Sequence, residues 1–232
     1  MAGYCKRLKN AYGGIDRGAM VSIDQAVAMV KERAVAKFDE TIDVVFRCNI
    51  DTKKSDQVLR SIVSLPEGTG KVVRVAVFAK DAAAETAKKA GADIVGAEDL
   101  VERIQRGEMD FDSCIATPDM MALVGRLGKV LGPRGLMPNP KLGTVTADVE
   151  KAVKAVKGGQ ISFRADKSGI VHSVIGKASF SAEALLNNFR ALYGALIEAK
   201  PASVKNDLVS RVFVSSTMGV SVRVDVSSIK FS

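Results

Sequence analysis

The sequence predicts an α/β protein in which both chain ends fold together into an α+β outer domain, with a Rossmann-like α/β domain inserted between them. Between residues 68 and 159, short strand patterns alternate with helix patterns, which is typical of a parallel sheet with helical crossovers. Turn-forming glycines bracket this segment, near Gly68 and at Gly159. Each flanking piece holds too few elements to bury a core alone. We therefore expect 1–67 and 160–232 to form one domain and 68–159 to form the other.

The first flanking piece is expected to contain a helix, a strand and a second helix. Ser22 opens a capping box, and the apolar stripe behind it predicts a helix over 22–33. The apolar run over 42–50, bounded by acidic residues, predicts a strand. A second helix is predicted over 55–65, ending before Pro66.

The middle segment is expected to follow a βαβα order. Its predicted strands are 72–79, 93–95 and 113–116, and its predicted helices are 82–90, 97–106, 120–131 and 149–156. The loop 131–143 carries three prolines and three glycines, which exclude regular structure there.

The last flanking piece is expected to supply more strands and one long helix. Strands are predicted over 160–163, 169–176, 208–215 and 220–226. Leu185, Phe189, Leu192 and Leu196 form the apolar stripe of a helix that ends before Pro201.

Composition excludes several classes of protein. In 232 residues there is no apolar run long enough for a membrane helix, and the amino end lacks the apolar core of a secretory signal, so we expect a cytoplasmic protein without a membrane partner. Cys5, Cys48 and Cys114 are odd in number and contain no CxxC pair. They fit neither a disulfide framework nor a zinc site, so we expect reduced thiols, with Cys48 and Cys114 buried in strands.

The charge balance favours a polyanionic partner. The net charge is +8, and the flanking pieces carry most of the excess, with 20 basic against 14 acidic residues. Because Trp is absent and aromatic residues make up 5%, folded RNA is a better candidate than a bare single strand. Arg126, Lys129, Arg134 and Lys141 lie in an acid-free stretch of the middle segment, which predicts either a second, weaker contact surface or a merely solvated one.

The residues needed for catalysis are missing. The single histidine, His172, lies in a predicted strand, where a structural role is the usual one. No HExxH, GxSxG or metal-ligand pattern occurs. The Gly-Lys pairs at Gly70, Gly128 and Gly176 lack the remaining phosphate-loop residues, and no dinucleotide glycines follow the strand 72–79. We expect no enzyme activity, no cofactor and no metal; the rival interpretation is a small-ligand or nucleotide-binding enzyme using the α/β domain.

A hairpin turn near the carboxyl end is the strongest local signal. Ser216-Thr217-Met218-Gly219 joins two predicted strands, and Gly219 is expected to supply a positive φ. Any hairpin needs such a turn, but an exposed methionine there is unusual, and packing against a sugar or base would explain it.

Along nearly its whole length the chain resembles the family of the universal large-subunit ribosomal protein of the mobile stalk, bacterial type. The segments that carry the resemblance are Ala36-Lys37-Phe38-Asp39-Glu40-Thr41, Asp56-Gln57 with Arg60, Ser64-Leu65-Pro66, the loop 131–141, Gly176-Lys177-Ala178-Ser179-Phe180, and Ser216-Thr217-Met218-Gly219.

The resemblance implies a split outer domain that binds the stalk helices of large-subunit ribosomal RNA (rRNA), and an inserted domain that faces the exit site and assists release of deacylated transfer RNA (tRNA). It leaves direct contact with that tRNA open. It also implies a monomer off the ribosome that represses translation of its own messenger RNA (mRNA). Carried over by position, the RNA-binding residues are Lys37, Phe38, Thr41, Arg164, Lys167, Ser168, His172, Thr217, Met218 and Gly219.

Two of these groups have plain structural alternatives. Lys37 and Phe38 could form a strand entry with Phe38 in the core, and Arg164 and Lys167 could belong to a solvated hairpin turn. An assembly factor or repressor that binds RNA off the ribosome is a further alternative function, because one RNA-binding face would serve both roles.

Overall fold

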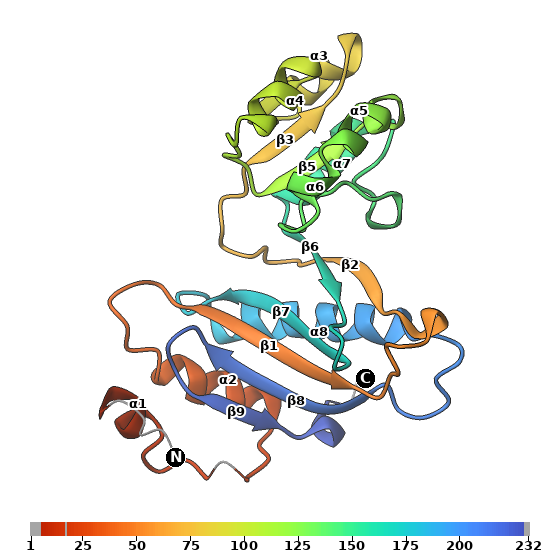
Figure 1. Ribbon diagram of the computed structural model, residues 1–232. Coiled ribbons are helices and arrows are strands. Elements are labelled where there is room, and N and C mark those ends of the chain that lie inside the picture. The colour runs from red at the N-terminus through yellow and green to blue at the C-terminus, as the bar shows by residue number, and fades with distance from the viewer. Residues whose placement is uncertain (1–5, 17, 230–232) are drawn as a thin grey trace. The chain divides into compact units, whose positions relative to one another are not determined.

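The computed structural model describes residues 6–16 and 18–229, and the chain divides into two compact units. The outer unit combines the chain up to Gly70 with the chain from Ser162 onward, and the inserted unit is Lys71–Ile161. Helices and strands are mixed in both, so the α/β class predicted from the sequence is confirmed (Figure 1).

An antiparallel sheet of four strands is the centre of the outer unit. Its order is β7-β1-β8-β9, formed by β7 (Ile170–Lys177), β1 (Thr41–Cys48), β8 (Val209–Ser216) and β9 (Ser221–Val224). The inner strand β1 comes from the amino-terminal piece, and its neighbours come from the carboxyl-terminal piece. Neither piece can therefore form this sheet alone.

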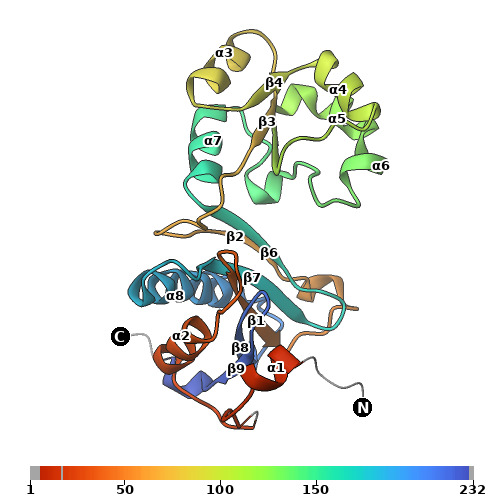
Figure 2. The ribbon, with the colours of Figure 1, turned by 90° about the vertical axis from the view of Figure 1, so that its left-hand side faces the viewer.

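Two helices cover one face of this sheet, α2 (Ile23–Glu32) and α8 (Ala182–Glu198) (Figure 2). Their amino ends are capped by serine hydroxyls that accept backbone N–H groups: Ser22 caps α2, as the sequence predicts, and Ser181 caps α8. Phe46 of β1 meets Phe189 of α8 at a ring-centroid distance of 6.0 Å in the core. The opposite face of the sheet carries neither helix.

The segment predicted as a helix over 55–65 is not helical, and this prediction is wrong. It forms a 3-10 turn η1 (Ser55–Gln57) and then strand β2 (Arg60–Ser64), which pairs with β6 (Gln160–Arg164) in a separate two-stranded sheet. Leu59, Val63 and Leu65 are buried. These three positions are separated by even numbers of residues, which places them on one covered face of a strand.

One buried asparagine fixes the chain where it leaves this small sheet. Asn188 of α8 is fully buried, and its side-chain amide donates to the carbonyl oxygens of Gly68 at 2.9 Å and Ile175 at 2.8 Å. Its amide oxygen accepts the N–H of Glu67 at 3.0 Å. The side chain is satisfied entirely within the outer unit.

The remaining elements of the outer unit lie at the chain ends. They are α1 (Lys6–Ala11) and the 3-10 turn η4 (Val226–Ser228).

The inserted unit is built on a parallel sheet of three strands in the order β4-β3-β5, formed by β4 (Ile94–Gly96), β3 (Val75–Phe78) and β5 (Ser113–Ala116). Its longer helices are α3 (Asp81–Lys89), α4 (Glu98–Gln105) and α7 (Val149–Lys157). Buried residues form two separate clusters, one containing Phe78 and Leu100 and the other containing Val77 and Val153. Two cores on a central sheet are what a three-layer α/β arrangement requires.

The predicted helix 120–131 is broken into three pieces: η2 (Pro118–Met120), α5 (Met121–Arg126) and α6 (Gly128–Leu131). The break falls at Leu127, just before Gly128, a residue with low helix propensity. The proline-rich loop that follows contains only a 3-10 turn, η3 (Pro140–Leu142).

Candidate functional site

The hairpin turn between β8 and β9 is hydrogen-bonded to the start of β1. The N–H of Thr217 donates to the carbonyl oxygen of Thr41 at 3.0 Å, and the N–H of Thr41 donates to Thr217 Oγ1 at 3.0 Å. The Thr217 hydroxyl donates back to the Thr41 carbonyl oxygen at 3.2 Å. The Thr217 side chain thus joins the two segments, and only its remaining lone pair is available to a ligand.

Glu40 supports both segments from beneath. Its side chain is buried, and its two carboxylate oxygens each accept one backbone N–H at 2.9 Å, Oε1 from Ala36 and Oε2 from Met218. Burial raises the pKa of Glu40, but the N–H groups of Met218 and Ala36 outweigh it and hold the pKa below its ordinary value. The neighbouring Ser216 Oγ is buried and makes no hydrogen bond among the described residues.

Two large apolar side chains project from these supported loops. Phe38 is 53% exposed and Met218 is 46% exposed, and Lys37 beside them is exposed as well. The structure thus brings together six of the ten predicted site residues, which we name the turn cluster: Lys37, Phe38, Thr41, Thr217, Met218 and Gly219. The alternative that Phe38 lies in the core is wrong.

Gly219 is needed for a different reason from the one expected. Gly219 does not have a positive φ, so the expectation that it supplies one to the turn is wrong. Instead, a Cβ at this position would lie 2.1 Å from Ser216 Oγ and 3.4 Å from Ser216 Cβ. Glycine is required because the turn folds tightly onto Ser216, and not because of its backbone angles.

Lys167 and Ser168 lie in a second turn, between β6 and β7, at the other end of β1. The Asp166 carboxylate organises this turn by accepting the N–H groups of Ser168 and Ile170, and the Ile170 N–H above all lowers the pKa of Asp166. The turn adjoins Cys48 at the end of β1, because the Cys48 N–H donates to the Gly169 carbonyl oxygen. Thr41 and Cys48 are seven residues apart along the strand, or about 23 Å. The structure therefore does not gather all predicted site residues at one point.

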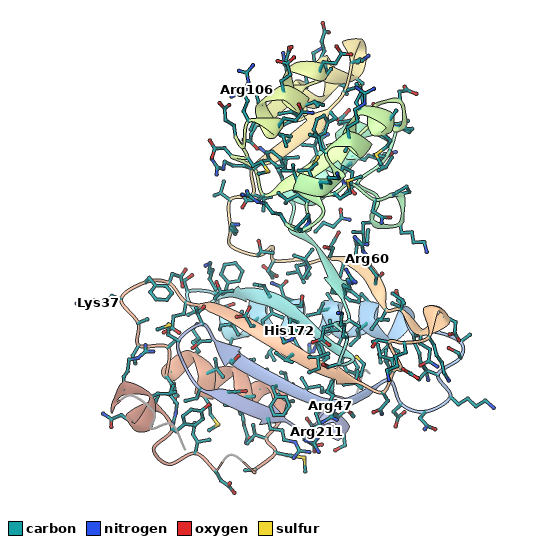
Figure 3. All side chains as sticks on the ribbon, viewed as in Figure 1. Lys37, Arg47, Arg60, Arg106, His172 and Arg211 are labelled. Carbon is teal, nitrogen blue, oxygen red and sulfur yellow. The ribbon has the colours of Figure 1, made fainter. Side chains whose placement is uncertain are left out.

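The helix-free face of the four-stranded sheet lies between these two ends. Because side chains directly opposite each other on paired strands share a face, the register identifies its residues. One row across the sheet is His172, Val45, Phe213 and Arg223, and the next toward the second turn is Ile170, Arg47 and Arg211. His172 of β7, Arg47 of β1 and Arg211 of β8 are labelled in Figure 3. Of the predicted residues, His172 is exposed on this face, and Arg164 is exposed on β6.

The charges on this face are mainly positive. Its positive side chains are Arg47, Arg211, Arg223 and Lys177. The Nζ of Lys177 donates to Thr41 Oγ1 at 2.8 Å. The one carboxylate at an outward position of β1 is Asp43. Burial raises its pKa, against the smaller opposing effects of His172 and Lys177.

Sequence reasoning missed Arg47, Arg211 and Arg223. Each lies at an outward position in an alternating strand, so the pattern shows that it avoids the core. The pattern does not show which strands are neighbours in the sheet. Only the register of the paired strands places Arg47 opposite Arg211.

Other kinds of site find no support in the described parts of the chain. Within 6–16 and 18–229, no three His, Cys, Asp or Glu side chains are grouped so that they could hold a metal ion. Cys48 and Cys114 are free and buried, and burial raises their thiol pKa values to about 11 and about 12, which makes them inert; Cys5 lies outside the described residues. No described helix has the length and apolarity needed to cross a bilayer.

The comparison with protein families identifies the family of the chain. The family described as "Ribosomal protein L1p/L10e family" matches residues 30–220, which include the whole turn cluster and the whole inserted unit. This match confirms the resemblance to the ribosomal stalk protein. The chain belongs to the ribosomal protein L1p/L10e family, a family of structural, non-enzymatic proteins, and is therefore an rRNA-binding structural protein of the large subunit, located on ribosomes in the cytoplasm.

Proposed function

We propose that the turn cluster and the helix-free face of the outer sheet bind the stalk region of large-subunit rRNA. The observation that carries the proposal is the exposure of Phe38 and Met218 on two loops that Glu40 holds together. Large apolar side chains on hydrogen-bonded loops lose little conformational freedom on binding, so they suit contact with riboses and unstacked bases.

Each neighbour in the cluster has a matching role. Lys37 supplies a positive charge for a phosphate, and the backbone of the Thr217 turn supplies polar groups for phosphates or 2′-hydroxyls. At the far end of β1, Lys167 and Ser168 offer a second contact, with His172 on the sheet between and Arg164 on β6. An RNA helix is large enough to reach both ends.

The test removes the apolar contacts one at a time. Phe38→Ala and Met218→Asp should each weaken binding to a stalk rRNA transcript by roughly tenfold or more in a filter-binding assay, because each deletes a contact without opening the core. Val72→Asp is the matched control, since Val72 is 89% exposed in the inserted unit. Wild-type affinity in both variants would refute the proposal.

The same surface also supports the proposed repression of the protein's own synthesis. An mRNA that copies the rRNA site would use the same contacts, so the variants should lose affinity for the two RNAs by similar factors. A variant that lost rRNA but retained the mRNA would show that the two RNAs bind different surfaces.

For the inserted unit we propose a supporting role in release of deacylated tRNA from the exit site. Its support is the acid-free stretch 120–147, in which every basic residue is exposed: Arg126, Lys129, Arg134 and Lys141. Off the ribosome we propose that the protein is a monomer, with residues 1–67 and 160–232 as the RNA-binding domain and 68–159 as the inserted domain.

A further inference from the structure

Two arginines face each other directly across neighbouring strands on the helix-free face. Arg47 of β1 is the register partner of Arg211 of β8, and both side chains are exposed. Among residues 6–16 and 18–229, neither takes part in an ion pair within 4.0 Å. Directly opposed like charges destabilise a strand pair. The free protein therefore places two like charges opposite each other, with no carboxylate of the described chain within ion-pair distance of either.

A third arginine on the same face is also left unsatisfied. Arg223 of β9 is the register partner of Phe213, one row from Arg211. Its Nε atom is buried and has no hydrogen-bond partner among the described residues. Because that atom is buried, a ligand cannot reach it directly; Arg223 contributes positive charge to the face, close enough to the Asp225 carboxylate to lower its pKa.

The strands do not need these guanidinium groups for their own pairing. The Ser210 hydroxyl donates to the carbonyl oxygen of Arg47 at 2.9 Å, and the strands stay paired on both sides of the pair, with a register shift between Arg47 and Cys48. The side chains of Arg47 and Arg211 are thus available to a ligand. Planar guanidinium groups bind phosphate through two parallel hydrogen bonds, which a lysine cannot reproduce.

We propose that Arg47 and Arg211, with Arg223 beside them, form a phosphate clamp that holds the RNA backbone where it crosses the sheet. The inference rests on the proposed RNA-binding function and adds a second, separate contact to it. Arg211 and Thr217 are six residues apart along β8, or about 20 Å. The clamp and the turn cluster therefore hold different stretches of the same RNA.

The clamp is tested by removing its charges in the full-length protein. Arg47→Gln and Arg211→Gln should each weaken binding to the stalk rRNA transcript roughly tenfold, since each removes charge-assisted hydrogen bonds. Each should also reduce the slope of log affinity against log salt by about 1. Arg190→Gln is the matched control, because Arg190 is exposed on α8, which covers the opposite face; its affinity and slope should equal those of the wild type.

Two further readouts separate a phosphate clamp from a structural role. Arg211→Lys keeps the charge but loses the planar fork, so it should keep the salt slope and recover only part of the affinity. In the free protein, Arg47→Gln should raise the thermal unfolding midpoint by removing the repulsion. Backbone footprinting should show lost protection in one RNA stretch for the arginine variants and in another for Phe38→Ala.

The outcomes distinguish the clamp from the function on which it rests. If Phe38→Ala and Met218→Asp weaken binding while the arginine variants behave like Arg190→Gln, the clamp is refuted and the RNA-binding surface stands. If none of these variants weakens binding, both proposals fail. Loss of affinity in the arginine variants with an unchanged salt slope would also refute the clamp.

Discussion

At the scale of single residues, Glu40 supports the turn cluster although its own side chain is buried. One carboxylate satisfies N–H groups from two segments that are far apart in the sequence, Ala36 and Met218. Glutamine at this position would keep one acceptor and place an amide donor against the other N–H. We expect Glu40→Gln to lower the free energy of unfolding by about 1–3 kcal/mol, measured by urea denaturation, and to weaken RNA binding.

The effect of Glu40→Gln on the free energy of unfolding should depend on pH. Because the folded protein holds the pKa of Glu40 below its ordinary value of 4.5, the carboxylate stabilises the fold above that value, and this stabilisation is lost as pH falls through the lowered pKa. The difference in unfolding free energy between wild type and Glu40→Gln should therefore shrink below pH 4.5. Glu32→Gln, at an exposed position of α2, is the control and should show little difference at either pH.

At the scale of elements, the β8–β9 hairpin depends on close packing within its turn. In Gly219→Ala the new methyl group would overlap Ser216 Oγ. We expect a loss of about 1–3 kcal/mol in stability, measured by thermal or urea unfolding, together with weaker RNA binding.

A second substitution checks the cause. Ser216→Ala removes the oxygen that causes the overlap, and that oxygen has no hydrogen-bond partner among the described residues. The double variant Ser216→Ala/Gly219→Ala should recover most of the lost stability. If it were no more stable than Gly219→Ala, a backbone requirement at Gly219 would be the better explanation.

The elements also show what the sequence could predict. Strand β1 and helices α2 and α8 were predicted correctly because one face of each is buried, which produces a clear apolar period. The helix over 55–65 was wrong because a short segment with several apolar residues fits both periods, and only pairing with β6 decides between them. Glu40 and the Arg47–Arg211 pair could not be predicted, since both depend on contacts between distant segments.

At the scale of the whole molecule, the two units differ in how their chains are assembled. The inserted unit is one continuous segment with its own buried clusters, whereas the sheet of the outer unit needs strands from both ends of the chain. We expect a fragment of residues 71–161 to unfold cooperatively by circular dichroism.

The contrasting fragment provides the control. Residues 1–70 contain β1 but neither of its neighbours, β7 and β8, so this fragment should not fold. Cooperative unfolding of the 1–70 fragment, or its absence in the 71–161 fragment, would contradict the division into units.

The Asn188 side chain has a consequence for motion between the units. By fixing Glu67 and Gly68 against α8, it makes the chain up to Gly68 move with the outer unit. Gly70 still lies against Lys177 and Phe180 of the outer unit, so the chain is held on that unit until it continues toward β3 at Val75. A single amide within a helix thus helps to fix the last residues of the outer unit before the crossing.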